Sequence, residues 1–265
     1  MLGSLAPAPR VQTMIADRLR WIGTVVRNTR NPTPIFREWL GWQRGPYRVT
    51  SRGGALFELR PGRGDWYGYM ETLLRCDYLS LGQRLDAGAT VVDIGANVGG
   101  FAVSASQRIG RSGRVVAVEP EPNSFRQLEV NVTLNPGYAP IQALCCAVGG
   151  DRGEAVLHCD EKAMLNSFHH LEGRRSHTVD LKVPVLTLED VFDQAGVAFC
   201  HYLKIDAEGS EYDIIGTLTP QMASRVEQIT LEMHDVPGHE RSEVYSKLES
   251  MGYTVKPGVL TYAYH

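Results

Sequence analysis

From residue 89 onward, the chain alternates short apolar runs with segments of helical periodicity, and no other feature constrains its fold as strongly. The apolar runs predict strands over residues 90–94, 114–118, 141–147, 183–185, 202–205 and 228–233. Amphipathic segments predict helices over residues 97–109, 122–134, 188–194, 210–218 and 240–251, and a terminal hairpin over residues 253–256 and 259–264. Such alternation is typical of parallel strands joined by right-handed crossovers. We therefore expect an α/β fold with a doubly wound, mostly parallel sheet, a terminal antiparallel hairpin and two helix layers.

The first 85 residues do not follow this alternation and predict an N-terminal extension to a main domain over residues 86–265. Apolar positions recur at helical spacing over residues 11–26, which predicts a basic amphipathic helix. Residues 47–50 and 56–59 flank a Gly-Gly pair and predict a hairpin, and a helix is expected around residues 69–85.

Charge is distributed unevenly between these two parts. Residues 1–52 contain nine arginines against two acidic residues, so they carry a net +7 and the rest of the chain −10, for a formal total of −3. A basic arm on an acidic body can meet anionic lipid, nucleic acid or the body itself. For the helix, peripheral membrane contact through residues 10–30 and packing on the body or on a second subunit of a homo-oligomer are alternatives.

The five cysteines are odd in number and show no spacing suited to a zinc site. No apolar run reaches the roughly 18–20 residues that span a bilayer, and the first ten residues lack the apolar core of a signal peptide. These features predict a reduced, cytoplasmic protein, with membrane-peripheral attachment as the alternative.

The first strand of the main domain leads into an acidic residue and a glycine-rich turn, TVVDIGANVGGF over residues 90–101. Gly95 and Gly99 allow tight turning, and a helix starting near Asn97 would direct free N–H groups toward a ligand. A carboxylate at Asp93 would repel a pyrophosphate but attract the amino and sulfonium groups of S-adenosylmethionine. We therefore expect this cofactor.

Two later segments extend this prediction. Glu119 ends the next strand, where an acidic side chain can accept both ribose hydroxyls. The segment Ala147-Val148-Gly149 offers small residues and backbone groups to an adenine ring.

Four segments together resemble the FkbM family of S-adenosylmethionine-dependent methyltransferases: VVDIGANVGGF, VVAVEPEPNSF, AVGG, and LKIDAEGSEYDII followed by LEMH. The resemblance covers roughly residues 70–255. It implies a class I methyltransferase fold, which is Rossmann-like, and methyl transfer to oxygen on a sugar, glycan or natural product. It also implies that Asp93, Gly95, Asn97 and Gly99 hold the methionine end of the cofactor and that Glu119 holds the ribose.

Methyl transfer to a hydroxyl requires that the acceptor lose its proton. His234 is the first choice for general base because its ordinary pKa is near 6.5, with Asp206 orienting it or contacting the acceptor and Glu232 nearby. The rival arrangement is Mg²⁺ held by Asp206, Glu208 or Glu232, which would lower the pKa of the acceptor hydroxyl. The residues do not choose between these two arrangements.

Acceptor contacts are less well defined. His169 and His170 lie in an aperiodic stretch over residues 164–176 that is long enough for a lid, and Trp66 and Tyr67 can line an acceptor pocket or pack in the core. Two alternative functions are a nicotinamide oxidoreductase, whose G-x-G-x-x-G turn is absent here, and a membrane-associated module without turnover. Nucleic-acid binding is not expected, because the main domain is acidic.

Overall fold

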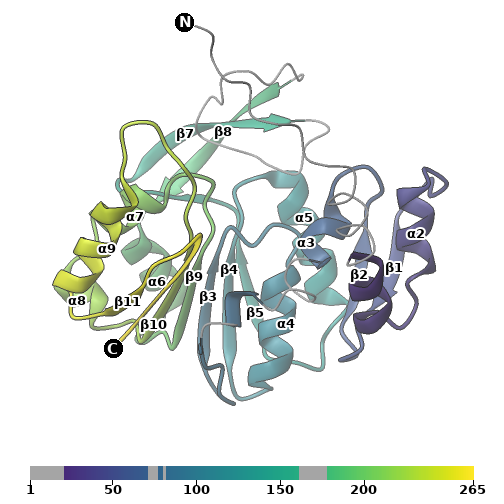
Figure 1. Ribbon diagram of the computed structural model, residues 1–265, viewed down its shortest axis with the longest axis horizontal. Coiled ribbons are helices and arrows are strands. Elements are labelled where there is room, and N and C mark those ends of the chain that lie inside the picture. Colours follow the sequence, from purple (N-terminus) through teal and green to yellow (C-terminus); the bar gives the residue numbers. More distant parts are fainter. Residues whose placement is uncertain (1–20, 71–76, 80–81, 161–177) are drawn as a thin grey trace, which may run out of the picture.

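The computed structural model describes residues 21–70, 77–79, 82–160 and 178–265 (Figure 1). Its centre is a seven-stranded sheet in the order β11-β12-β10-β9-β3-β4-β5. The strands are β3 (Thr90–Ile94), β4 (Arg114–Val118), β5 (Ile141–Leu144), β9 (Tyr202–Ile205), β10 (Gln228–Glu232), β11 (Thr254–Lys256) and β12 (Leu260–Tyr264). β12 runs antiparallel to both of its neighbours, and β3, β4, β5, β9 and β10 are parallel to one another. The predicted mostly parallel sheet and terminal hairpin are confirmed.

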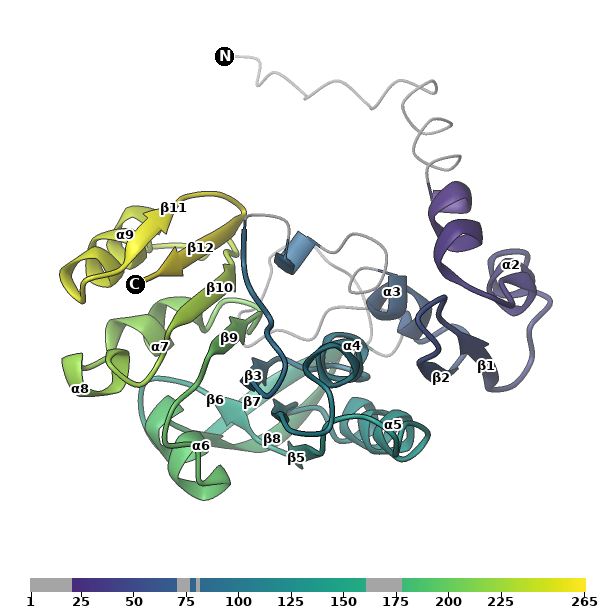
Figure 2. The ribbon, with the colours of Figure 1, turned by 90° about the horizontal axis from the view of Figure 1, so that it is seen from below.

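Helices cover both faces of this sheet (Figure 2). One face packs against α4 (Gly100–Ile109) and α5 (Pro122–Thr133), and the other packs against α6 (Leu188–Ala195), α7 (Glu211–Gly216), α8 (Pro220–Ala223) and α9 (Arg241–Ser250). Neighbouring strand residues face opposite layers: Val91 packs in the first layer and Val92 in the second, both fully buried. Because both faces are covered, these strands are apolar without alternation.

The N-terminal extension lies on the outer side of α4 and α5 (Figure 1). It contains helical residues 21–28, α2 (Thr33–Trp39), the hairpin β1 (Tyr47–Thr50) and β2 (Leu56–Leu59), and α3 (Asp65–Met70). Two asparagines of α5 bind the backbone of β2. Asn131 Oδ1 accepts the Glu58 N–H at 2.8 Å, and Asn135 contacts both the N–H and the C=O of Leu56 at 3.0 and 2.7 Å. These side-chain amides replace the strand partner that this hairpin edge lacks.

Two predicted strands were wrong in detail. The 141–147 strand is broken into β5 and β6 (Ala147–Val148), and β6 belongs to a separate sheet. That sheet also holds β7 (Gly153–Asp160), which was not predicted, and β8 (Thr178–Leu186), the extended form of the 183–185 run. β7 pairs with β8 over eight positions, so β8 has its partner outside the central sheet.

The predicted helix over residues 69–85 is also not found as such. α3 ends at Met70, the three residues of the 3₁₀ turn η2 (Asp77–Leu79) follow a gap in the described chain, and residues 82–85 are not helical. The Gln228 side chain explains the last segment, because it receives the Arg84 N–H at 2.9 Å and donates to the Arg84 C=O at 3.1 Å. A backbone bonded in this way cannot form helical hydrogen bonds.

Some expectations concern residues outside the described ranges. These are most of the amphipathic helix, residues 11–20, and the 164–176 stretch with His169 and His170. The four described cysteines are free thiols. Among the described residues, no helix combines the length and apolar character needed to cross a bilayer.

Candidate active site

The turn after β3 is pressed against the turn after β9. Gly95 has φ +76°, and a Cβ at this position would lie 1.8 Å from the Asp206 carbonyl oxygen. A non-hydrogen atom cannot be accommodated at that distance, so only glycine fits. The close approach predicted for Gly95 is therefore made to the neighbouring loop of the same chain, and it joins the two loops at the carboxyl edge of the sheet.

The helix after this turn begins three residues later than predicted. Asn97 and Gly99 have φ values of +49° and +86°, and α4 starts at Gly100. Residues with left-handed dihedrals cannot belong to a right-handed helix. Asn97 therefore presents its backbone N–H from a turn, and Gly99 packs against Leu128, whose Cδ1 would lie 2.6 Å from an added Cβ.

Glu119 lies at the end of β4, beside this turn. One of its carboxylate oxygens accepts the Asn97 N–H and the other accepts the Glu121 N–H, both at 2.9 Å. Its side chain is only 6% exposed, and burial raises its pKa to about 7 although the two N–H groups oppose the shift. Each oxygen retains a further lone pair, so the carboxylate can still accept hydroxyl groups.

Asp93 does not face the crevice as predicted. Its carboxylate is fully buried, and its Oδ1 lies 3.2 Å from the ammonium of Lys204. Lys204 is also buried, lies 3.3 Å from Asp206 Oδ2 and donates to the Gly95 C=O at 3.3 Å. Burial disfavours the charged ammonium, but the two carboxylates outweigh it and raise the pKa of Lys204. Asp93 thus holds a lysine that connects the two loops, because a buried carboxylate requires a cationic partner.

A tyrosine from outside the main domain joins the predicted acidic residues. The Tyr78 hydroxyl of η2 lies 2.6 Å from Glu232 Oε2 and 3.1 Å from Asp206 Oδ2. Burial and the charge of Asp206 raise the pKa of Glu232. The predicted pair Asp206 and Glu232 is therefore brought together, with Tyr78 between them. The pattern D-Y-L over residues 77–79 carries no motif that would have identified it.

His234 is held by glutamates. Its Nδ1 lies 3.0 Å from Oε1 of the fully buried Glu211, and its Nε2 lies 3.6 Å from Oε2 of Glu208. Glu211 is fixed in turn by the N–H groups of Ala207 and Gly209, at 2.8 and 2.9 Å. Of the two roles predicted for Asp206, orienting His234 belongs to Glu211 instead, and contact with the acceptor stays a prediction. Glu211 is part of the LKIDAEGSE segment. It is also the first residue of α7, where an acidic side chain can simply stabilise the helix N-terminus, so the sequence did not distinguish the two roles.

The pKa values in this cluster overturn the argument by which His234 was chosen as the base. Burial disfavours the imidazolium, but the hydrogen bond and charge of Glu211, with Glu208 and Asp206 adding to them, raise the pKa of His234 to about 9. Burial raises the pKa of Glu208 to about 7, against the attraction of His234. At neutral pH the proton therefore resides on His234, and Glu208 is the group that titrates there.

Backbone strain marks the same two loops. Among the described residues, only Asn97 and Glu208 combine a side chain with a positive φ, and both have φ +49°. Left-handed backbone costs a non-glycine residue about 1–2 kcal/mol. Strain of this kind concentrates at functional sites. Here it lies in the turn after β3, residues 95–99, which we call the donor loop, and in the turn after β9, residues 206–210, which we call the acidic loop.

Asp206, Glu211 and His234 each offer one atom within 4.8 Å of the other two, a spacing that a divalent cation can use. Their contacts, however, already satisfy them. Asp206 shares the Lys204 ammonium with Asp93, and both oxygens of Glu211 accept backbone N–H groups. The described arrangement thus fits a network of protons and one lysine better than a Mg²⁺ site, which would require open oxygen ligands and several waters.

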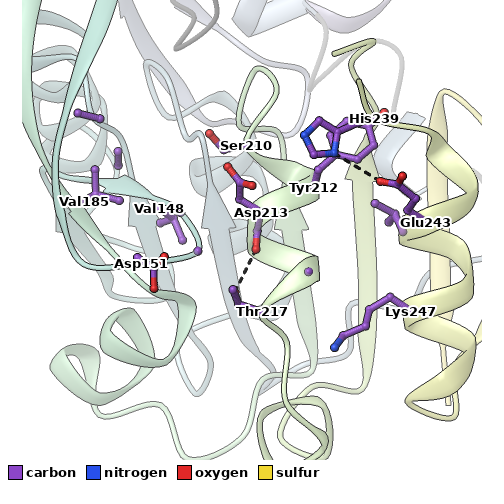
Figure 3. A pocket seen from close by; sticks show the side chains of 16 residues that line it. Val148, Asp151, Val185, Ser210, Tyr212, Asp213, Thr217, His239, Glu243 and Lys247 are labelled. Atoms are coloured by element: carbon purple, nitrogen blue, oxygen red, sulfur yellow. Dashed lines mark hydrogen bonds and ion pairs between the residues drawn. The ribbon is translucent and has the colours of Figure 1, made fainter. Parts of the chain in front are cut away.

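A cavity of about 700 Å³ lies beside the acidic loop, between the turn after β6, α7 and α9 (Figure 3). The predicted adenine contacts Ala147, Val148 and Gly149 all line it, whereas the residues predicted for the methionine end and the ribose do not. Tyr212 connects the cavity to the site, because its ring lies in the wall and its hydroxyl donates to the His234 C=O at 3.0 Å. The ring of His239 lies 4.8 Å from that of Tyr212.

The aromatic pair predicted for the acceptor packs within the extension. The ring of Trp66 lies edge-on to those of Trp21 and Trp39, with centroid distances of 6.4 and 5.3 Å. The ring centroid of Tyr67 lies 5.7 Å from that of Trp21. Gly68, in the same helix, abuts Asn97 of the donor loop, whose Nδ2 would lie 3.4 Å from an added Cβ. α3 thus supports the donor loop while its aromatic residues join the N-terminal core.

The residues around the donor loop fit S-adenosylmethionine. Glu119 has unused acceptor capacity for ribose hydroxyls, and Asn97 of the Gly95–Gly99 turn is exposed. The strand order is that of a doubly wound sheet with its reversal between β3 and β9, where ligands of such sheets bind. Asp93 would act on the methionine end through Lys204 and the loop, because its own carboxylate is enclosed.

Comparisons relate the chain to known proteins. Residues 93–255 match the Methyltransferase FkbM domain family. The chain is 27% identical over 209 residues to the 31-O-demethyl-FK506 methyltransferase FkbM of Streptomyces tacrolimicus, covering 68% of this chain and 78% of that one. Among solved structures, methyltransferase FkbM from Methylobacillus flagellatus aligns with a TM-score of 0.45 and 13% identity, covering 75% of this chain and 53% of that one.

Fibrillarin from Aeropyrum pernix, solved with natively bound S-adenosyl-L-methionine, aligns with a TM-score of 0.46 and 13% identity, covering 83% of this chain and 94% of that one. The family match begins at Asp93 near the end of β3 and includes the acidic loop and β10, so it covers the site described above except for Tyr78. The chain therefore belongs to the FkbM family and is an S-adenosylmethionine-dependent methyltransferase.

Proposed function

We propose that the protein transfers the methyl group of S-adenosylmethionine to a hydroxyl oxygen of a sugar, glycan or other natural product. The relative from Streptomyces tacrolimicus is named for methylation at an oxygen of FK506, which supports oxygen as the acceptor atom. The bound cofactor supplies an activated methyl group, so the chain itself has to position the acceptor and remove its proton.

The observation that carries this proposal is the convergence of Glu208, Glu232 and His234 beside the donor loop. A nitrogen or thiolate acceptor can react as its neutral or anionic base and needs little further help. A hydroxyl group, in contrast, requires a proton acceptor in the transition state. Burial raises the pKa of Glu208 to about 7, which suits that task because a base works best when its pKa lies near the working pH.

Within this cluster we assign proton removal to Glu208. Its side chain is about one-quarter exposed, at 27%, whereas Glu211 is fully buried and bonded to two backbone N–H groups. His234, held by Glu211, attracts the Glu208 carboxylate and keeps its ionised form available. Asp206 and Glu232, bridged by Tyr78, lie close enough to receive hydrogen bonds from other hydroxyls of the acceptor.

The proposal is tested by replacing Glu208→Gln, with Glu249→Gln on the exposed face of α9 as the matched control. We expect kcat to fall about 10²–10⁴-fold in the first variant, with unchanged S-adenosylmethionine affinity by calorimetry, and no change in the control. Formation of S-adenosylhomocysteine with a panel of sugars and polyketides would identify the acceptor, and NMR of the product would locate the methyl group. Methylation of nitrogen or carbon would contradict the proposal.

Chelation separates this arrangement from the metal alternative. Without a required cation, dialysis against EDTA leaves kcat unchanged, and added Mg²⁺ does not raise it. A metal held by Asp206 and its neighbours would instead be favoured by a different result: chelation removes activity, Mg²⁺ restores it, and the His234→Ala variant remains active.

A further inference from the structure

The N-terminal extension exposes apolar side chains that the rest of the described chain does not cover. Ile22, Val26, Leu40 and Trp42 are 41%, 46%, 58% and 64% exposed. Ile22 and Val26 are one turn apart on the helix of residues 21–28, while Trp21 and Val25 of the same helix pack inward. This helix is therefore apolar on its outward face as well as on its inward face.

Two of these residues are neighbours in space. Ile22 and Leu40 line one hollow of about 960 Å³ together with Arg44 and Trp39. Trp42 lies three residues beyond the end of α2 and is held to that helix by its N–H, which donates to the Arg37 C=O at 2.7 Å. Clustered exposed apolar residues mark an interaction surface more often than isolated ones do.

Arginines accompany the apolar residues. Arg27, Arg37 and Arg44 are exposed, and within the described ranges none of their side chains forms an ion pair or hydrogen bond. Glu38 is the single acidic residue among residues 21–52, and it is occupied by Tyr47 and the Gly62 N–H. We call Ile22, Val26, Leu40 and Trp42, with these three arginines, the docking face.

We propose that the docking face binds the surface of an anionic membrane. Arginine guanidinium groups meet lipid phosphates, while tryptophan and aliphatic side chains enter the boundary between headgroups and acyl chains. The apolar spacing of Ile22 and Val26 also continues upstream in the sequence through Leu19 and Ile15, so the amphipathic pattern is longer than the described helix.

Other occupants fit these residues less well. A nucleic acid would use the arginines but leave Leu40 and Trp42 without a role, since its outer surface is charged phosphate. A second copy of the chain would bring two segments of net charge +7 together across a symmetric interface, and like charges there oppose association.

The test uses the full-length protein with sucrose-loaded vesicles of phosphatidylcholine, with and without one-third phosphatidylglycerol. All four tryptophans of the chain lie within residues 21–66, so their emission reports on the extension alone. We expect sedimentation with the anionic vesicles, a blue shift of the emission, and weaker binding to neutral vesicles and at high salt.

Two pairs of variants separate the charged from the apolar contribution. Arg37→Glu/Arg44→Glu should weaken vesicle binding about 30-fold or more, and Leu40→Ser/Trp42→Ser about 10-fold. Controls of the same kind are Arg108→Glu/Arg111→Glu, which are exposed in the last turn of α4 and just after it, and Phe199→Ser/Val259→Ser, which are exposed in the main domain. The controls should bind as the wild type does.

Several results would overturn the proposal. These are no binding to anionic vesicles, or binding that Leu40→Ser/Trp42→Ser does not weaken. Binding of duplex DNA that depends on the arginines alone would assign the face to nucleic acid. A dimer seen by light scattering and lost in Leu40→Ser/Trp42→Ser would assign it to a second copy.

Discussion

The donor loop over residues 95–99 and the acidic loop over residues 206–210 occupy equivalent places in the fold. Each follows a buried parallel strand at the centre of the sheet, each contains one strained non-glycine residue, and the two touch at Gly95 and Asp206. They differ in what they present. The donor loop offers backbone groups and a shape, whereas the acidic loop offers side chains whose charges depend on one another.

Because of this difference, the sequence predicts the donor loop more completely than the acidic loop. A loop that acts through its backbone requires glycine at certain positions, and glycine is visible in the sequence. A loop that acts through titratable side chains depends on burial and on partners from other segments.

The largest effect is expected where the loops touch. Gly95→Ala places a methyl group 1.8 Å from the Asp206 carbonyl oxygen, so the loops must separate or the chain must fail to fold. We expect a loss of more than about 4 kcal/mol in the free energy of unfolding, measured by urea denaturation, or no soluble protein.

Gly196→Ala is the matched control for this prediction. Gly196 also has a left-handed φ, +62°, but nothing lies within 4 Å of an added Cβ. Gly196→Ala should lower the free energy of unfolding only by the cost of a left-handed backbone at alanine, about 1–2 kcal/mol. Equal losses in the two variants would show that the loops are not held together at Gly95.

The pH dependence of kcat is the next largest effect. If ionised Glu208 takes the proton, kcat rises with pH through a pKa of about 7 and falls about tenfold for each pH unit below it. His234→Gln removes the imidazolium that attracts the Glu208 carboxylate, so any residual activity should show this limb at higher pH. A limb near 9, the pKa of His234, would instead identify His234 as the base.

The smallest effect concerns backbone strain. Glu208→Gly relieves the left-handed backbone and removes a carboxylate that resists ionisation in the folded state, so we expect a gain of about 1 kcal/mol in stability together with loss of activity. Because folding raises the pKa of Glu208, its ionisation destabilises the fold increasingly as pH rises from 4.5 to about 7. The gain should therefore be larger at pH 8 than at pH 5.

Asn97→Gly is the corresponding change in the donor loop. Asparagine tolerates left-handed backbone better than glutamate does, so the stability should change by less than about 0.5 kcal/mol. Thermal unfolding of both variants at the two pH values provides the measurement. A larger gain from Asn97→Gly than from Glu208→Gly would mean that the strain belongs to the donor loop.

Much of the fold was predictable because most strands and helices of the central domain have a clear local sequence pattern. The strands 90–94, 114–118 and 202–205 were found at the predicted residues, since strands buried on both faces are continuous apolar runs. The small sheet of β6, β8 and β7 was not predicted. Its strand β7, with Glu154 and Val156 exposed, lacks the apolar run by which the central strands were recognised.

The doubly wound sheet, the cofactor and the positions of Gly95 and Glu119 follow from the sequence alone, because periodicity predicts the sheet and certain residues must be small or acidic where a strand ends. The folded chain was needed to show that Asp93 holds Lys204, that Glu211 orients His234 and that Tyr78 bridges Asp206 and Glu232. Each of these contacts joins residues far apart in the chain or sets a pKa through burial. The spacing of residues along the chain specifies neither which distant residues meet nor how deeply a group is buried. The pairings and pKa values of the acidic loop could therefore be established only from the folded structure.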